Sequence, residues 1–123
     1  MFPPIRERFA AGRNANGAEH WCALERMAGA RAAWAAATAE FDAVLCPTAP
    51  NLPPNLAKLM EQGEYYVTEN LLTLRNTRVG NVMGLCALSL PTGLPSCGIS
   101  LMCPPNAEDR LLRLGAAAEA ALA

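Results

Sequence analysis

The sequence predicts an α/β fold in which short strands, two of them forming a hairpin, are flanked by a long helix and a terminal helix. Residues 18–40 are rich in Ala, Leu, Glu, Arg and Met, which favour helix. Downstream, three short apolar segments each end at or just before a proline, which cannot continue a strand inside a sheet. Residues 107–123 return to an Ala- and Leu-rich helical composition.

The N-terminal part is predicted to be irregular until the long helix begins. Pro3-Pro4 and the loop-forming residues 12–17 argue against regular structure in residues 1–17, apart from a helical turn around Arg6–Ala11. The long helix then carries an apolar stripe at helical spacing. Such a stripe indicates core contact, and a free amphipathic partner helix is the alternative. The stripe comprises Trp21, Leu24, Met27, Ala28, Trp34, Ala35 and Phe41.

Prolines and glycines divide the middle of the chain into short elements. Ala43–Cys46 is predicted to be a buried strand that ends at Pro47, and the prolines that follow exclude regular structure until about Asn55. Three further elements come next: helical turns over Leu56–Gln62, a helical or irregular segment over Tyr65–Leu74, and a short helix over Asn76–Met83 that ends at Gly84.

The last third of the chain is predicted to hold a hairpin and a helix. Leu85–Leu90 and Cys97–Met102 are separated only by residues 92–96, so an antiparallel hairpin is the economical connection. Glu108 and Asp109 fall in the first turn of the terminal helix, where the helix dipole favours acidic side chains. The apolar face of this helix comprises Leu111, Leu112, Leu114, Ala118 and Leu122.

The charge and hydropathy of the chain exclude several classes of protein. The net charge is −1 and the basic residues form no stripe, so nucleic-acid binding has no electrostatic basis. No apolar run approaches about eighteen residues, so no membrane span is predicted, and the N-terminus shows no signal-peptide pattern. Hydrophobic residues make up 52% of the chain, which indicates either apolar surface meant for another polypeptide or simply an alanine-rich composition.

The cysteines predict reduced thiols and no metal or cofactor site. Five cysteines form an odd set without a C-x-x-C pair, and His20 is the single histidine. Cys46, Cys86 and Cys97 lie in apolar segments, where a thiol behaves as a small hydrophobe. Reduced cysteines of this kind favour a cytoplasmic location.

Several short pieces of sequence occur in an order that is hard to obtain by chance. They are the turn Arg6–Gly12, the segment Asp42–Pro50, a T-x3-N-x2-G pattern at Thr77, Asn81 and Gly84, an A-x-S-x-P strand at Ala87, Ser89 and Pro91, the strand with Leu94-Pro95 and Gly98-Ile99, and a closing helix with Glu108, Leu111, Leu112 and Glu119. In this order they resemble the C-terminal part of the amidase signature family, which hydrolyses carboxamides with a Ser–Ser–Lys triad. The resemblance implies one partial domain over residues 1–123, its strands belonging to a mixed sheet.

The residues that carry catalysis in this family are missing from the chain. Its Gly/Ser-rich segment and upstream lysine have no counterpart in the 123 residues. The only lysine, Lys58, lies in a Pro-rich loop and is predicted to be a solvated surface residue. Ser89, Ser96 and Ser100 lack Gly-rich turns, and Ser89 is interpreted as a buried strand hydroxyl. No catalytic residue is therefore assigned.

The sequence also departs from the family pattern. Cys86 stands where the family usually has proline, and Thr92 where a small residue or cysteine is frequent. Leu74 occupies the place where the tRNA amidotransferase relatives carry an acidic residue that contacts the substrate amino group. Since leucine cannot pair with an ammonium group, this departure argues against glutamine as the nitrogen donor.

The resemblance places the threonine–asparagine–glycine segment beside the substrate cleft. Thr77 and Asn81 are the leading candidates for cleft residues, and the alternative is local bonding, with Thr77 capping a short helix. Arg75 and Arg78 are candidates to receive a substrate carboxylate through a two-pronged contact, and the alternative is that both are simply exposed.

These features predict the C-terminal portion of an amidase signature amidohydrolase, a hydrolase of carboxamide C–N bonds. The chain would supply sheet, helices and one wall of the cleft, and would be inactive alone. Its partner would be the remaining N-terminal amidase segment, with a small carboxamide as substrate of the complete enzyme. The alternative is a non-catalytic module that self-associates through exposed apolar surface. A third alternative is an independent small hydrolase that uses Cys97 or a serine, and its thiol version would pair Cys97 with His20 if the two met in space.

Overall fold

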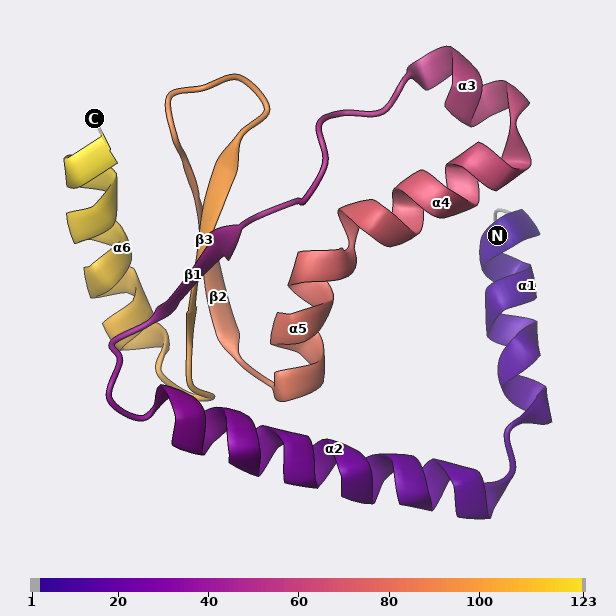
Figure 1. Ribbon diagram of the computed structural model, residues 1–123, viewed down its shortest axis with the longest axis horizontal. Coiled ribbons are helices and arrows are strands. Elements are labelled where there is room, and N and C mark those ends of the chain that lie inside the picture. Colours follow the sequence, from indigo (N-terminus) through magenta and orange to yellow (C-terminus); the bar gives the residue numbers. More distant parts are fainter. Residues whose placement is uncertain (1–2, 123) are drawn as a thin grey trace.

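The computed structural model describes residues 3–122, apart from the side chain of Pro4. Figure 1 shows a small sheet with one helix beside it and a long helical arm that curves away and returns. The elements in chain order are α1 (Pro3–Ala11), η1 (Gly12–Asn14), α2 (Gly17–Thr38), β1 (Val44–Pro47), α3 (Leu56–Glu61), α4 (Gly63–Thr73), α5 (Arg75–Met83), β2 (Cys86–Pro91), β3 (Gly98–Cys103) and α6 (Glu108–Leu122).

The three strands form one sheet in the order β1-β3-β2. β2 and β3 pair as the predicted antiparallel hairpin, with Leu88 opposite Leu101. β1 joins the other edge of β3 with Cys46 opposite Ser100, so β3 is the central strand. The α/β class is confirmed. All strand pairs among residues 3–122 are antiparallel. The mixed sheet that the resemblance implies, which would also include parallel neighbours, stays a prediction.

One face of the sheet packs against α6 and forms the core. The buried members of this core are Leu90, Leu101, Cys103 and Leu111. Gly115 lies where α6 meets β2, and a Cβ at this position would collide with the side chain of Leu88. The small residue therefore sets how closely α6 approaches the sheet.

The opposite face of the sheet is only partly covered. Because side chains alternate along a strand, Ser89, Ser100 and Met102 point away from α6. A Cβ placed on Gly80 of α5 would lie 4.0 Å from the terminal methyl carbon of Met102. Helix α5 thus covers the end of this face near Met102, and the end with the serines lies outside that contact.

The predicted core contact of the long helix is wrong for most of its stripe. No residue of α2 is buried, and Trp21 and Phe41 are each 64% exposed. Met27 and Trp34 are half-buried. The physical reason is visible in Figure 1, where α2 extends away from the sheet and meets the rest of the chain near its C-terminal end. None of the described residues covers the remaining stripe.

Local sequence explains where α2 begins. The Asn16 side chain accepts the Glu19 backbone N–H at 2.8 Å, and the Glu19 carboxylate accepts the Asn16 backbone N–H at 3.3 Å. This reciprocal capping box satisfies two of the amide groups that a helix N-terminus leaves without partners.

Three sequence expectations need correction or refinement. The irregular N-terminus is wrong for residues 3–5, because α1 spans Pro3–Ala11 and includes the helical turn predicted around Arg6–Ala11. Proline at a first helical position fits the fixed φ of its ring. Residues 1–2 lie outside the described range. Tyr65–Leu74, open between helix and irregular structure, is largely α4. Cys97 is exposed before β3, whereas Cys46 and Cys86 are half-buried as small apolar side chains.

Helix α5 is held at both ends by side-chain to backbone hydrogen bonds. Near its start, the Asn76 side chain donates to the Pro47 carbonyl at 2.7 Å. At its end, Arg31 of α2 donates from Nε to the Val82 carbonyl at 2.8 Å. Gly84 then ends the helix in the left-handed region, with φ of 73°, as predicted from the sequence. Among residues 3–122, no helix is long and apolar enough to cross a bilayer.

The terminal helix offers a matched test of the core. Leu111 is 4% exposed and its neighbour Leu112 is 60% exposed. We expect Leu111→Ala to lower the free energy of unfolding by about 2–5 kcal/mol, because it leaves a cavity against the sheet. Leu112→Ala should change it by less than about 0.5 kcal/mol. Urea unfolding followed by circular dichroism measures both, and equal effects would contradict the packing of α6.

The Arg31 contact predicts a local effect on α5. Arg31→Gln removes a charged donor from the last carbonyls of the helix, and we expect the local opening free energy of α5 to fall by about 1 kcal/mol, or roughly fivefold in exchange rate. Amide hydrogen exchange of residues 79–84 measures this change. Arg26→Gln on the same helix serves as the control. Unchanged exchange in Arg31→Gln would show that the contact does not hold α5.

Candidate functional site

Three hydroxyl groups meet on the sheet face that α6 does not cover. The Thr48 hydroxyl lies 2.8 Å from that of Ser100, and the Ser89 hydroxyl lies 3.0 Å from that of Ser100. Thr48 also donates to Ser89 at 3.4 Å. Ser100 is 3% exposed, and its two partners satisfy its hydrogen-bonding capacity. Ser89 and Ser100 thus come from β2 and β3, and Thr48 is the residue directly after β1.

An open cavity of about 480 Å³ lies beside this hydroxyl cluster. It is bounded by the segment that follows β1 and by the turn of the β2–β3 hairpin. None of its lining residues is charged, so it suits an apolar or neutral hydrogen-bonding group. The lining comprises Pro47, Thr48, Ala49, Pro50, Asn51, Leu52, Ser89, Leu90, Pro91, Ser96, Cys97 and Gly98.

Gly98 allows Thr48 to lie very close to the start of β3. The Thr48 backbone N–H donates to the Gly98 carbonyl at 2.9 Å, which extends the pairing of β1 with β3 by one bond. A Cβ on Gly98 would lie 3.0 Å from the Thr48 hydroxyl. A larger residue at this position would therefore push the threonine away from the two serines.

The four residues predicted for the cleft all lie on α5. Arg75 and Arg78 are exposed and one helical turn apart. Thr77 is exposed, and its hydroxyl donates to the Leu74 carbonyl at 3.2 Å, a local bond of the kind weighed as the alternative to a cleft role. Asn81 is exposed, and its backbone carbonyl accepts the Gly84 N–H at 3.3 Å. None of the four lines the 480 Å³ cavity, so their role in a cleft stays a prediction.

Sequence reasoning missed the residue that positions α5 against the strands. Asn76 lies between two candidates, and its amide binds the carbonyl of Pro47, directly before Thr48. A polar residue one position before the motif threonine was the available signal. The prediction that Ser89 is buried is also wrong. Ser89 is exposed because the sheet face on which it lies is open at that end, whereas Ser100 on the central strand is buried.

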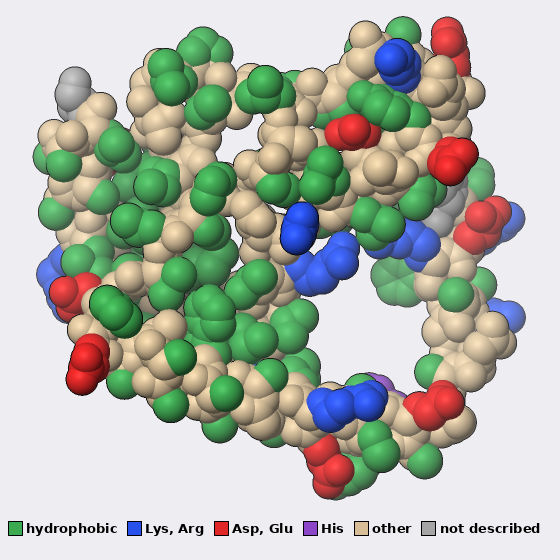
Figure 2. All heavy atoms as spheres, viewed as in Figure 1, with side chains coloured by type: hydrophobic (Ala, Val, Ile, Leu, Met, Phe, Trp, Pro, Cys, Tyr) green, Lys and Arg blue, Asp and Glu red, His purple; other side chains and the backbone are tan. Residues whose placement is uncertain are grey.

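A second groove, of about 320 Å³, lies between α1 and α4. Charged Glu7 and Arg8 of α1 face Tyr66 and Asn70 of α4 across it. Figure 2 shows Lys and Arg side chains along the rim of the opening that α1, α2, α4 and α5 surround. Basic side chains thus gather on the inner side of the curved helical arm.

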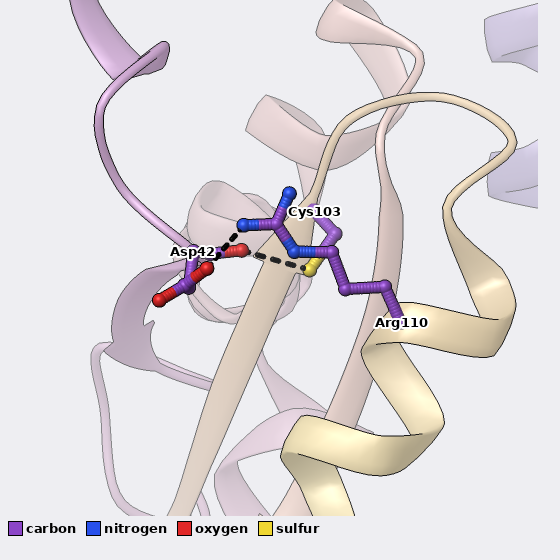
Figure 3. Close-up of polar contacts among 3 residues, drawn as sticks. All are labelled: Asp42, Cys103 and Arg110. Carbon is purple, nitrogen blue, oxygen red and sulfur yellow. Dashed lines mark hydrogen bonds and ion pairs between the residues drawn. The ribbon is translucent and has the colours of Figure 1, made fainter.

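A third groove, of about 450 Å³, lies at the C-terminal end of α2. It is mainly apolar, and its lining includes Trp34, Phe41, Arg31 and Arg110. Arg110 of α6 forms an ion pair with Asp42, and the Cys103 thiol donates to the Asp42 backbone carbonyl at 3.4 Å (Figure 3). These two contacts fix the connection between α2 and β1 to the sheet and to α6.

Burial sets the chemistry of two thiols. Burial raises the pKa of Cys46, and it is the main cause that raises the pKa of Cys103. Both thiols are therefore mainly protonated at neutral pH. Among residues 3–122, no group of three His, Cys, Asp or Glu side chains is placed to hold a metal ion.

The structure does not support a catalytic role for Lys58 or for a Cys97–His20 pair. Lys58 is exposed, as predicted, and its ammonium group lies 5.9 Å from the centre of the Tyr65 ring. His20 lies near the start of α2 and Cys97 in the hairpin turn, and Figure 1 shows these two segments well apart. The proposed thiol–imidazole pair is therefore not formed.

Comparison with known proteins gives a consistent family. The family model described as Amidase matches residues 2–112. A 2-amino-5-chloromuconic acid deaminase from Comamonas testosteroni is 36% identical over 125 residues, covering 96% of this chain and 26% of the relative. A glutamyl-tRNA(Gln) amidotransferase subunit from Rhodococcus erythropolis is 34% identical over 87 residues, covering 67% of this chain and 17% of the relative.

The chain spans about a quarter or less of the length of these curated relatives. No solved structure matches the chain significantly. The family match covers most of the chain, and the strand order, the helix end at Gly84 and the hairpin agree with the sequence pieces that first suggested it. The chain therefore belongs to the amidase family.

Proposed function

We propose that this chain is the C-terminal portion of an amidase-family amidohydrolase that hydrolyses carboxamide C–N bonds. It supplies three strands, flanking helices and one wall of the substrate cleft, and it is inactive by itself. The observation that carries the proposal is the partial match. The chain aligns over 96% of its own length with only 26% of a relative, and its sequence holds no Gly/Ser-rich segment. The serines and lysine of the triad then come from another polypeptide segment.

The uncovered surfaces support this division of labour. The sheet face with the hydroxyl cluster is open at the end that α5 leaves free, and the apolar stripe of α2 is largely exposed. Single exposed apolar residues are ordinary, but an extended run of them indicates a contact surface. The proposed partner is the remaining N-terminal amidase segment, which packs on both surfaces.

Helix α5 supports a role beside the cleft. It is anchored to β1 through Asn76 and to α2 through Arg31, while its predicted cleft residues stay exposed. In this proposal Thr77 and Asn81 contact the substrate amide. Arg75 and Arg78 receive a carboxylate on the same molecule, since guanidinium groups bind carboxylates in a two-pronged geometry.

The substrate class follows from these side chains. We propose a small acid that carries the scissile amide, because two exposed arginines lie on α5 and the helix itself contains no carboxylate. The Comamonas testosteroni relative is named for action on a muconic acid. Leu74 cannot pair with an ammonium group, which argues against the glutamine used by amidotransferases. The enzyme works without a cofactor, in the cytoplasm.

A non-catalytic module that associates with itself is the second candidate. The specific observation in its favour is exposed apolar side chains along the helical arm, outside the sheet. They include Phe9, Trp21, Leu56, Met60 and Val67. A module of this kind would bury the same surfaces against a second copy, without any serine-bearing partner.

Mixing the two parts of the fold tests the first proposal. The chain is purified alone and together with the serine-bearing N-terminal part of the Comamonas testosteroni relative, expressed as a separate polypeptide. We expect no ammonia release from carboxamides with either part alone, and release when the two are combined, because the triad and the cleft wall are then present together. Hydrolysis by the chain alone would contradict the proposal. A stable, inactive oligomer of the chain that does not bind the second polypeptide would favour the self-associating, non-catalytic module.

Arginine substitutions in the combined enzyme test the substrate class. We expect Arg78→Gln to raise KM for an acid-bearing amide by about tenfold, since it removes a charged contact made equally in ground and transition states. KM for a neutral amide of the same size should not change. Arg113→Gln on α6 is the matched control. An equal rise for both amides would show that Arg78 does not receive a carboxylate.

A further inference from the structure

Cys86 and Cys103 lie directly opposite each other in the β2–β3 hairpin. Both belong to the sheet face that packs on α6, so their side chains project to the same side. Opposed residues in an antiparallel pair have Cβ atoms about 4.5–5.5 Å apart. A disulfide takes a Cβ separation of about 3.5–4.5 Å, so a small local approach is enough to join the two sulfurs.

The two thiols are at present held by separate backbone carbonyls. The Cys86 thiol donates to the Pro104 carbonyl at 3.2 Å and lies 3.7 Å from the Cys103 carbonyl. The Cys103 thiol instead donates to the Asp42 carbonyl. Rotation of the Cys103 side chain about its Cα–Cβ bond would turn its sulfur from Asp42 towards Cys86.

Accessibility divides the roles of the two sulfurs. Cys103 is 1% exposed, whereas Cys86 is half-buried and open to a small solute. The pKa of Cys103 is raised first by burial and then by Cys86 and Asp42, against the opposing effect of Arg110. An oxidant from solution therefore meets Cys86 first, and Cys103 is the second, resolving thiol.

We propose that Cys86 and Cys103 form a modification site for small hydroperoxides, at which oxidation closes a reversible disulfide. The Cys86 thiolate attacks the peroxide O–O bond, giving a sulfenic acid and one water or alcohol. The Cys103 sulfur then attacks the Cys86 sulfur, the S–O bond breaks, and the departing hydroxide takes the proton of the Cys103 thiol and leaves as water. Two thiols lose two electrons and two protons in all, and one peroxide is reduced.

Disulfide formation has a structural consequence at the corner between α2 and β1. Once its sulfur is joined to Cys86, Cys103 has no hydrogen to donate to the Asp42 carbonyl. Asp42 is then held to α6 by the ion pair with Arg110 (Figure 3) and to the sheet by the pairing of β1 that follows it. Oxidation thus loosens the junction through which the long helix is tied to the sheet, whatever the chain's part in catalysis.

No other pair among the five cysteines has this arrangement. Cys46 lies opposite Ser100, on the other face of the sheet from Cys103. Cys22 is on the exposed arm of α2, and Cys97 is in the hairpin turn. Either of these would have to cross to another part of the molecule to reach Cys86.

Peptide mapping of the whole 123-residue chain tests the site. The chain is treated with hydrogen peroxide and digested without reduction. We expect one intramolecular link between the peptides of Cys86 and Cys103, a mass loss of about 2 Da, and full reversal by dithiothreitol. Cys86→Ser should abolish the link and Cys46→Ser should leave it intact. Links among other cysteines, links only between chains, or sulfenic acid that does not resolve would each overturn the proposal.

Hydrogen exchange supplies a second readout that also covers a variant with altered folding. On oxidation of the native chain we expect amide exchange around residues 42–44 to rise several-fold and to return to its starting rate with dithiothreitol. Cys86→Ser should show no such rise. Unchanged exchange in the oxidised native chain, with the link present, would overturn the predicted loosening of the corner.

Discussion

The pairing of β3 with strands on both sides is the interaction on which the rest of this chain depends. β3 holds β1 from the middle of the sequence and β2 from the hairpin, and its side chains supply most of the buried residues on both faces. Leu101 and Cys103 face α6, while Ser100 and Met102 face the other way. Alternate side chains of β3 thus belong to the core against α6 or to the face with the hydroxyl cluster. One short strand therefore contributes contacts to both faces of the sheet.

The same strand separates the side of the sheet that α6 covers from a side that is only partly covered. On the α6 side, apolar side chains meet a helix and exclude water, which is the usual source of stability. On the other side, three hydroxyls satisfy one another, and helices α1, α2, α4 and α5 surround an opening (Figure 2). A polar cluster that is already bonded internally can be covered later without leaving a buried group unpaired. This property agrees with the proposal that the chain is part of a larger fold.

Sequence reasoning predicted elements fixed by local chemistry and missed features fixed by distant contacts. The hairpin, the helix end at Gly84 and the acidic first turn of α6 follow from a short loop, a glycine and a dipole, and all three are present. The burial of α2 could not be read from its stripe, because periodicity shows which face is apolar and not whether anything covers it. The Asn76–Pro47 bond and the hydroxyl cluster join residues 29 and up to 52 positions apart, beyond any local pattern.

The two anchors of α5 decide how a cleft could be completed. Asn76 fixes the helix to the end of β1, and Arg31 fixes it to α2, so the orientation of α5 is set by contacts inside this chain. A wall that is already ordered costs less conformational entropy on association than one that must fold at that moment. The exposed side chains of Thr77 and Asn81 are therefore presented in a defined direction before any partner arrives. If the contacts of Asp42 between α2 and β1 were lost, α2 could shift, and its Arg31 hydrogen bond would transmit that shift to α5. The α2–β1 connection is linked in this way to the predicted cleft residues.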